Sequence, residues 1–276
     1  MSWHGHLTLR YRRDGERTVA HDAHDGPLRV LKALYPEGDG VCHHVLVHPP
    51  GGIAGGDRLD IAVEVGDGAH ALITSAGAAR FYRSDEQPAA QIARLQVQNN
   101  ARLEWLPLET IAFPGCRASN QVHFDLAPGA QCIGWDLLAL GLPAADQAFT
   151  TGWIEQQLHW PGVWLERGRI AAEDKRLLES PPGLAGHRAL GTIWLASQTP
   201  WTTVQRDTLL DAARDLAAAS ELAATAGATA IDPRLVLLRV LAPRIEPLFA
   251  LLGQVRAAWR QLAWQMDAAP PRVWRT

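Results

Sequence analysis

Apolar and polar residues alternate along much of the first 200 positions, which is the pattern of half-buried β-strands. The alternation is clearest over residues 7–11, 59–65 and 122–126. Further strands are predicted from short apolar runs between Gly, Pro and Asp turns, at 28–31, 41–47, 103–105 and 192–197. The chain is therefore predicted to be mainly β.

Tight turns recur at a nearly constant spacing in this region. Residues 65–69, 97–101 and 126–130 each contain a strand end, a two-residue turn and an alanine that begins the next strand, at separations of 32 and 29 residues. Pro161-Gly162 falls near the next expected place. Turns at a fixed period are typical of stacked strand pairs. We therefore predict stacked antiparallel strands in a β-solenoid or a long β-sandwich.

A rigid loop separates the runs at 41–47 and 59–65. It contains two prolines and four glycines, which exclude a helix or a regular strand interior. Its glycines have the spacing of a phosphate-binding P-loop, but Asp57 and Arg58 stand where that motif needs Lys and Ser or Thr, which argues against nucleotide binding. We predict a tightly turned connection that holds His48 and Asp57 in place; its structural residues are Pro49, Pro50, Gly51, Gly52, Gly55 and Gly56.

The last third of the chain has a different residue pattern, with apolar residues at helical spacing. Asp207 is predicted to cap a helix with apolar residues at helical spacing over 209–217. An eight-residue apolar run at 234–241 lies between two prolines and is predicted to be a strand. Pro247 is predicted to open a second helix that extends to Met266, with one apolar stripe that packs on its own sheet.

Composition excludes several classes of protein. The net charge of -3 lacks the basic surface of a nucleic-acid binder. No apolar run approaches the ~20 residues of a membrane span, and the first residues, which lack a charged segment followed by an apolar one, predict no secretory signal. Three cysteines without a C-x-x-C spacing favour neither disulfides nor structural zinc, so we expect a reducing, cytoplasmic location. The 11 tryptophans indicate large buried anchors or a binding surface.

Several motifs, in this order along the chain, resemble the urease accessory proteins of the UreD (UreH) family. They are the loop at 48–57, then 74–84, 103–109, 140–144, 180–186 and 271–274; the departures are Ala54, Ala76 and Arg80.

The resemblance implies one UreD-like domain over 1–276, with a β stack at 1–200, a helical part at 201–266 and a partner-binding tail at 267–276. It implies a β-helix-like fold and a non-enzymatic scaffold, without a tightly bound cofactor, that helps deliver nickel to urease. The implied partners are apo-urease, a UreF-type accessory protein and, through it, a UreG-type GTPase, with room for a homodimer in the complex.

Histidine and cysteine side chains form a first set of candidate metal ligands. Seven of the 11 histidines lie in the first 48 residues. Positions i and i+2 of a strand share a face about 6.6 Å apart, so Cys42 and His44 can share an ion, whereas His44 and His48 need a bend between them. Thiolate and imidazole suit nickel. The alternative is that these are scattered histidines, because two ligands alone rarely hold a metal.

Acidic residues near the motifs form a second candidate set for a transient nickel route: Asp57, Glu109, Asp136 and Glu173. Each lies beside Gly, Pro or aromatic residues, so we expect partial burial, and a buried carboxylate must be paired or solvated internally. The alternative partners are arginines at positions 58, 80, 83 and 117. The resemblance favours an internal polar passage.

Two other functions remain open. The sequence contains no nucleophile elbow, no H-E-x-x-H zinc motif and no kinase motifs. A β-solenoid carbohydrate-active enzyme would use stacked strands and tryptophans, but it needs a pair of carboxylates about 5–10 Å apart. A structural adaptor that never binds metal would share the partners of the nickel scaffold.

Overall fold

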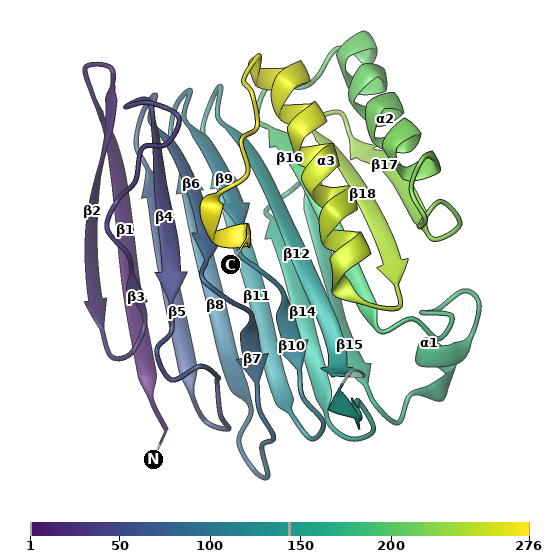
Figure 1. Ribbon diagram of the computed structural model, residues 1–276. Coiled ribbons are helices and arrows are strands. Elements are labelled where there is room, and N and C mark those ends of the chain that lie inside the picture. The colour runs from purple at the N-terminus through teal and green to yellow at the C-terminus, as the bar shows by residue number, and fades with distance from the viewer. Residues whose placement is uncertain (1, 143–144, 276) are drawn as a thin grey trace.

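Two β-sheets lie face to face in the computed structural model, with two long helices in front of one of them (Figure 1). The structure describes residues 2–142 and 145–275, so Pro143 and Ala144 of the 140–144 motif, Met1 and Thr276 lie outside the described residues.

The strands are β1 (His4–Asp14), β2 (Arg17–Asp25), β3 (Arg29–Val30), β4 (Val41–Val47), β5 (Arg58–Val65), β6 (His70–Ser75), β7 (Ala79–Phe81), β8 (Ala89–Val97), β9 (Arg102–Leu106), β10 (Thr110–Ala112), β11 (Arg117–Leu126), β12 (Gln131–Leu142), β13 (Gln147–Ala148), β14 (Trp153–Trp160), β15 (Trp164–Ala171), β16 (Ala189–Ser197), β17 (Ala226–Asp232) and β18 (Leu235–Ala242). The helices are α1 (Lys175–Glu179), α2 (Thr203–Ala218) and α3 (Ile245–Trp264).

The mainly β, solenoid-like stack is confirmed, but the direction of strand pairing differs from the prediction. Sheet A has the order β15-β14-β11-β8-β5-β1-β2, and sheet B has β17-β18-β16-β12-β9-β6-β4-β3. The central pairs are parallel in both sheets, as in β5·β8, β8·β11, β6·β9 and β9·β12. Antiparallel pairs occur toward the edges, for example β1·β2 and β14·β15.

The repeated turns explain this pairing. The turns at 66–69, 98–101 and 127–130 each lead from a strand of sheet A to one of sheet B rather than closing a hairpin within one sheet. They stack on one another, since the Gly68 amide donates to the Asn99 carbonyl at 2.9 Å and the Asn100 amide donates to the Pro128 carbonyl at 3.0 Å. Gly68, Asn100 and Gly129 all have positive φ, as tight turns require. The fourth turn, at Gly162, instead joins the hairpin β14–β15 and ends the stack on sheet A.

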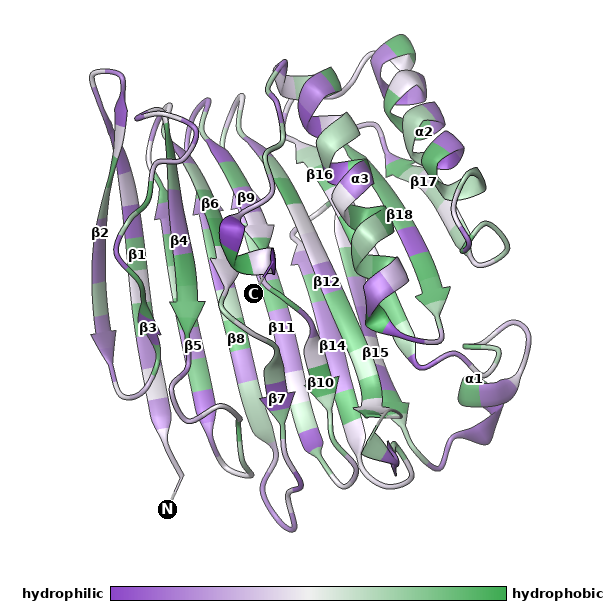
Figure 2. Ribbon diagram, viewed as in Figure 1, coloured by the Kyte–Doolittle hydropathy of each residue, from purple (hydrophilic) through white to green (hydrophobic). Residues whose placement is uncertain are grey.

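Alternation decides which side chains fill the space between the sheets. Leu59, Ile61, Val63 and Val65 of β5 are all buried there. Strand β4 is buried along both faces, and Figure 2 shows it as hydrophobic over most of its length. Strands whose second face is also covered lose the alternation, because both faces then need apolar or paired side chains.

The two long helices cover the outer face of sheet B. Helix α3 packs on β12, β16 and β18, and helix α2 packs on α3 and β17 (Figure 1). Both helices and strand β18 are confirmed, but two boundaries were wrong. Thr202, not Asp207, caps α2 through a capping box with Gln205, and α3 begins at Ile245, before Pro247.

The C-terminal tail lies on the protein rather than extending from it. It leaves α3 and crosses the front of sheet B, where Arg272–Arg275 form a 3-10 turn (Figure 1). The Trp274 indole contacts Trp135 and Phe249, and its Nε1 donates to Thr74 Oγ1 at 2.8 Å.

All three cysteines are buried free thiols. None of the described helices is long and apolar enough to cross a bilayer.

Candidate functional site

A cavity of about 280 Å³ lies between the two sheets. Strands β5, β8 and β11 of sheet A form one wall, and β4, β9, β10 and β12 of sheet B contribute to the other. The rigid loop at 48–57, which we call the Pro/Gly loop, adds His48, Gly51 and Ile53 to the lining. The lining is largely apolar, so its few polar side chains stand out as the groups able to bind a ligand.

Two of those polar side chains, Gln91 and Asn120, form a row across sheet A together with Gln156. Gln91, Asn120 and Gln156 lie in register on β8, β11 and β14. The Gln91 Nε2 donates to Asn120 Oδ1 at 3.2 Å. Facing them from β12, Asp136 accepts from Asn120 Nδ2 at 3.2 Å and from Gln156 Nε2. A carboxylate is thus held between two amides in the middle of the sandwich. We call these four residues the interior row.

Asp136 carries a charge that nothing nearby compensates. Across residues 2–142 and 145–275 it forms no ion pair, and its hydrogen-bond donors are neutral amides. Burial, and then the negative charge of Glu166, raise its pKa from 3.8 to about 7. Its exposed surface faces cavities, because it lines two of them. A divalent cation is the partner that would stabilise its ionised form.

The second cavity, of about 580 Å³, begins on the other side of Asp136. Gln156, Glu166 and Arg239 line it together with residues of β16, β17 and β18. Arg239 Nη2 donates to Glu166 Oε2, so this second carboxylate has a cationic partner that Asp136 lacks. The two cavities share Asp136, which makes that residue the junction between them.

The Pro/Gly loop has the rigid, tightly turned form that its composition predicted. Gly51 and Gly56 have φ values of +77° and +85°. A Cβ on Gly52 would lie 2.0 Å from the Tyr82 ring, and one on Gly55 would lie 2.2 Å from the Ser84 hydroxyl. The backbone of Ile53 pairs with Arg80 and Tyr82, so the loop is fixed against β7.

Asp57 stabilises this loop through hydrogen bonds to the backbone. Its Oδ1 accepts from the Trp3 amide at 2.8 Å and its Oδ2 accepts from the Ala54 amide at 2.9 Å. Both oxygens are thereby occupied by backbone donors. His48, at the other end of the loop, is half-buried and lines the cavity. Burial lowers the pKa of His48, and the negative charge of Asp57 opposes this shift. Of the two, His48 is the side chain that faces the cavity.

The other two acidic candidates do not join the interior row. Glu109 is half-buried between cavity-lining residues but is not itself in the lining. Glu173 is exposed in the turn before α1, so the expected burial is wrong for it. Within the described part of the chain, the predicted arginine pairs are also wrong, since Arg58 binds Asp60, Arg83 binds Asp85 and Arg117 donates to the Glu86 carbonyl.

Cys42 and His44 share the inner face of β4, as their spacing predicted, but they lie apart from the interior row. Burial raises the pKa of the Cys42 thiol and lowers that of His44. The His44 Nδ1 accepts from the Tyr11 hydroxyl at 2.7 Å. Burial favours the protonated Cys42 thiol, and the Tyr11 hydroxyl occupies the His44 Nδ1, so neither atom is free to bind a cation in transit. His4 and His6 are exposed on β1 and hydrogen-bond to Asp60 and Thr8 respectively.

Sequence reasoning missed the amides of the interior row. Asn120 occupies an inward position of the alternating strand that contains Val122 and Phe124, and Gln156 does the same between Ile154 and Leu158. The signal in the sequence that could have revealed them is a polar residue at a position where the alternating pattern requires an apolar one.

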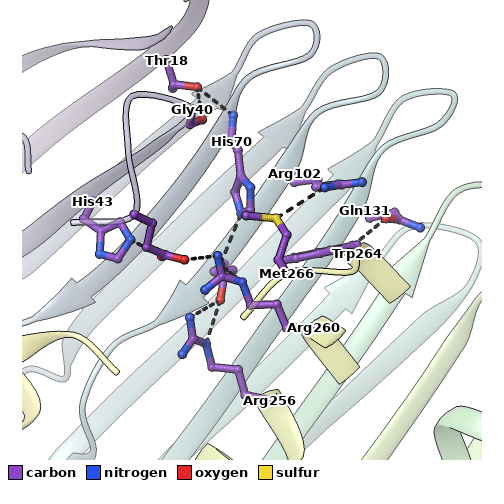
Figure 3. A network of polar contacts seen from close by, with 12 residues as sticks. Thr18, Gly40, His43, His70, Arg102, Gln131, Arg256, Arg260, Trp264 and Met266 are labelled. Atoms are coloured by element: carbon purple, nitrogen blue, oxygen red, sulfur yellow. Dashed lines mark hydrogen bonds and ion pairs between the residues drawn. The ribbon is translucent and has the colours of Figure 1, made fainter. Parts of the chain in front are cut away.

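A second polar cluster, between sheet B and helix α3, was also missed (Figure 3). The fully buried Glu104 of β9 binds Arg256 at 2.7 Å, Arg260 at 3.5 Å and His70 at 3.2 Å. Arg260 also binds Glu37, which accepts from His43. We call these six residues the ion network. Arg256 holds the pKa of Glu104 well below its usual range, despite the opposing effect of burial. Glu104 is therefore a compensated charge that fixes α3 to the sheet.

Known proteins resemble this chain over its full length. The family model described as UreD urease accessory protein matches residues 4–275. The chain belongs to the UreD family of urease accessory proteins. It is 57% identical over 278 residues to the urease accessory protein UreD of Leptothrix cholodnii, covering 100% of both chains. It is 53% identical over 276 residues to that of Variovorax paradoxus, with 100% of both covered, and 54% identical to that of Albidiferax ferrireducens, with 99% of both covered.

The resemblance expected from the motifs is thus confirmed. It extends beyond them, because the matched residues include every described strand of both sheets, and with them the positions of the interior row.

Proposed function

We propose that this chain is a non-catalytic scaffold in urease maturation that passes nickel to apo-urease through the space between its sheets. The observation that carries the proposal is Asp136, a carboxylate that has no cationic partner among the described residues and lies where two cavities meet. Membership of the urease accessory family supports nickel as the cargo.

The chemistry of the interior row suits transfer rather than storage. Near neutral pH a proton and a divalent cation compete for Asp136, whose pKa is about 7, so the cation displaces a readily lost proton. Asn120 and Gln156 can turn their amide oxygens toward the ion as further weak ligands. Among the described residues no group of three or more His, Cys, Asp or Glu side chains is arranged to hold a metal, which favours short residence.

The charges on the walls of the two cavities support a direction of transfer. One end of the route has half-buried, neutral His48 beside the rigid Pro/Gly loop. The other end has Glu166 beyond Asp136. A cation moving from the imidazole toward the two carboxylates encounters increasing negative charge, while Arg239 keeps Glu166 partly compensated.

Family membership, rather than a surface of this chain, supports the partners that we propose. We propose that it binds apo-urease and a UreF-type protein, through which it meets a UreG-type GTPase, in the cytoplasm and with a homodimer as one form of the complex. The loop at 48–57 lacks the Lys and Ser or Thr of a P-loop, so GTP hydrolysis is assigned to the partner. Asp57, Glu109, Glu173, Cys42 and His44 are assigned no contact with nickel.

Carbohydrate binding receives little support. Seven of the 11 tryptophans are buried and Trp3 is the one in the exposed class, at 51% exposure, so the indoles are used mainly for packing. The metal-free adaptor remains the alternative to test, since it would bind the same partners.

The test is co-expression of urease and its accessory proteins with and without this chain. Purified urease is assayed for nickel content and activity, and a pull-down on the chain reports the complex. We expect folded urease that lacks nickel when the chain is omitted. Fully active, nickel-loaded urease without it would overturn the proposal, and a complex that forms with no effect on nickel would favour the adaptor.

A further inference from the structure

Two histidines face each other on the uncovered outer side of sheet A, away from both cavities. His123 of β11 and His159 of β14 are in-register neighbours on parallel strands. Their ring centroids lie 5.5 Å apart at an interplanar angle of 81°, and their Nδ1 atoms are 3.4 Å apart. Both side chains are half-exposed, so water and ions reach them.

The distance between the two Nδ1 atoms matches a shared metal ion. Imidazole nitrogens bind zinc-like cations at about 2.0–2.1 Å. Two nitrogens 3.4 Å apart and each about 2.1 Å from one ion subtend an angle of about 108° at it, close to tetrahedral. At 3.4 Å a hydrogen bond between the same atoms is long and weak. The pair is therefore spaced better for an ion than for a shared proton.

A series of hydrogen-bonded polar side chains along β11 orients His123 as a metal ligand. The His123 Nε2 contacts Gln121 Oε1 at 3.1 Å, and the Gln121 amide nitrogen donates to Ser119 Oγ at 3.0 Å. With its amide group oriented by Ser119, Gln121 accepts the Nε2 proton of His123. That tautomer leaves a lone pair on Nδ1, directed at His159. Ligating histidines are typically oriented by such an acceptor on the other ring nitrogen.

The charged neighbours permit a cation there. Burial, with smaller effects of His159 and Arg94, lowers the pKa of His123, which keeps it neutral at pH 7. Arg94 is in register with His123 on β8, but its guanidinium donates to Asp60 at 3.2 Å. The carboxylate of Asp60, which Arg58 also binds, thus offsets part of the positive charge of Arg94.

We propose that His123 and His159 form a surface site for a borderline divalent transition cation such as Ni²⁺ or Zn²⁺, with water in the remaining positions. On binding, His159 moves its Nδ1 proton to Nε2, so both Nδ1 atoms become ligands without a net change of protonation. The site is separate from the interior row and does not rest on the proposed nickel route.

The test is equilibrium dialysis of the purified full chain against NiCl₂ at pH 7.5, with bound nickel quantified by mass spectrometry. The double variant His123→Ala/His159→Ala is expected to lose one equivalent of nickel, and each single variant to bind that equivalent at least tenfold more weakly. The matched control His6→Ala removes an exposed histidine from the same sheet face and should bind as wild type does.

Gln121→Leu sharpens the test, because it keeps both imidazoles but removes the acceptor of the His123 Nε2 proton. We expect several-fold weaker binding of the same equivalent. Asp136→Asn should leave this equivalent intact, which separates the surface site from the interior row. Unchanged nickel stoichiometry and affinity in the double variant would overturn the proposal.

Discussion

Two interior carboxylates on neighbouring strands of sheet B have opposite surroundings. Glu104 of β9 lies between the sheet and α3, against two arginines. Asp136 of β12 lies between the sheets, against two neutral amides. The pKa of Glu104 is lowered, whereas that of Asp136 is raised to about 7.

The difference separates a structural ion pair, at Glu104, from a carboxylate that is available as a ligand, at Asp136. The arginines satisfy the charge of Glu104, and that pairing joins elements 152 residues apart in the sequence. Asp136 has no such partner in the described chain, so its ionised form is destabilised until a cation arrives. The ion pairs of Glu104 stabilise the fold, whereas the unpaired carboxylate of Asp136 can bind a cation.

The largest effect is expected when the ion network loses its central charge. Glu104→Gln keeps the shape of the side chain but leaves Arg256 and Arg260 buried without their shared anion. We expect a loss of about 3–5 kcal/mol in the free energy of unfolding, measured by urea denaturation.

Asp136→Asn is the matched change at the other carboxylate, and it removes a charge that has no cationic partner. It should cost far less than Glu104→Gln under the same conditions. Equal losses in the two variants would contradict the distinction between a compensated and an uncompensated charge.

A smaller effect is expected at the loop that borders the interior row. In Gly52→Ala the added methyl would meet the Tyr82 ring, so we expect a loss of about 1–3 kcal/mol in the free energy of unfolding. Gly77→Ala is the control, since nothing lies within 4 Å of its Cβ position and its φ is not positive. If both variants unfold at the same denaturant concentration, the loop is not held as tightly as its contacts indicate.

A further effect is expected on the pH dependence of stability, and its sign differs between the two carboxylates. The raised pKa of Asp136 stabilises the fold fully below pH 3.8, and this contribution is lost as pH rises toward about 7. The lowered pKa of Glu104 stabilises the fold above 4.5 and is lost as pH falls. Unfolding free energies measured from pH 4 to 8 should therefore decline less with rising pH in Asp136→Asn than in wild type. An unchanged slope would contradict the raised pKa.

Much of the stack could be predicted from the sequence, because alternation and turn residues are local signals. The turns at 66–69, 98–101 and 127–130 were located correctly. A tight turn does not reveal whether the next strand joins the same sheet or the opposite one, so parallel pairing could not be predicted from it.

The polar clusters depend on contacts between distant elements. Glu104 alternates with the apolar Leu103 and Trp105, a pattern typical of a solvent-facing position, but α3 covers it. The burial of Arg256 and Arg260 depends on the same packing of α3 on the sheet. Asp136 was predicted from its neighbours, but its amide partners come from strands of the other sheet.

The most direct test of the account is the nickel content of urease matured with the Asp136→Asn variant. Urease is co-expressed with its accessory proteins, and nickel per active site is measured beside activity and the amount of complex recovered. Asp125→Asn, which alters an exposed carboxylate of β11, is the control. We predict an intact complex with at least tenfold slower nickel loading in Asp136→Asn and normal loading in Asp125→Asn. Normal loading in both variants, with the complex intact, would contradict a role for the uncompensated carboxylate in transfer.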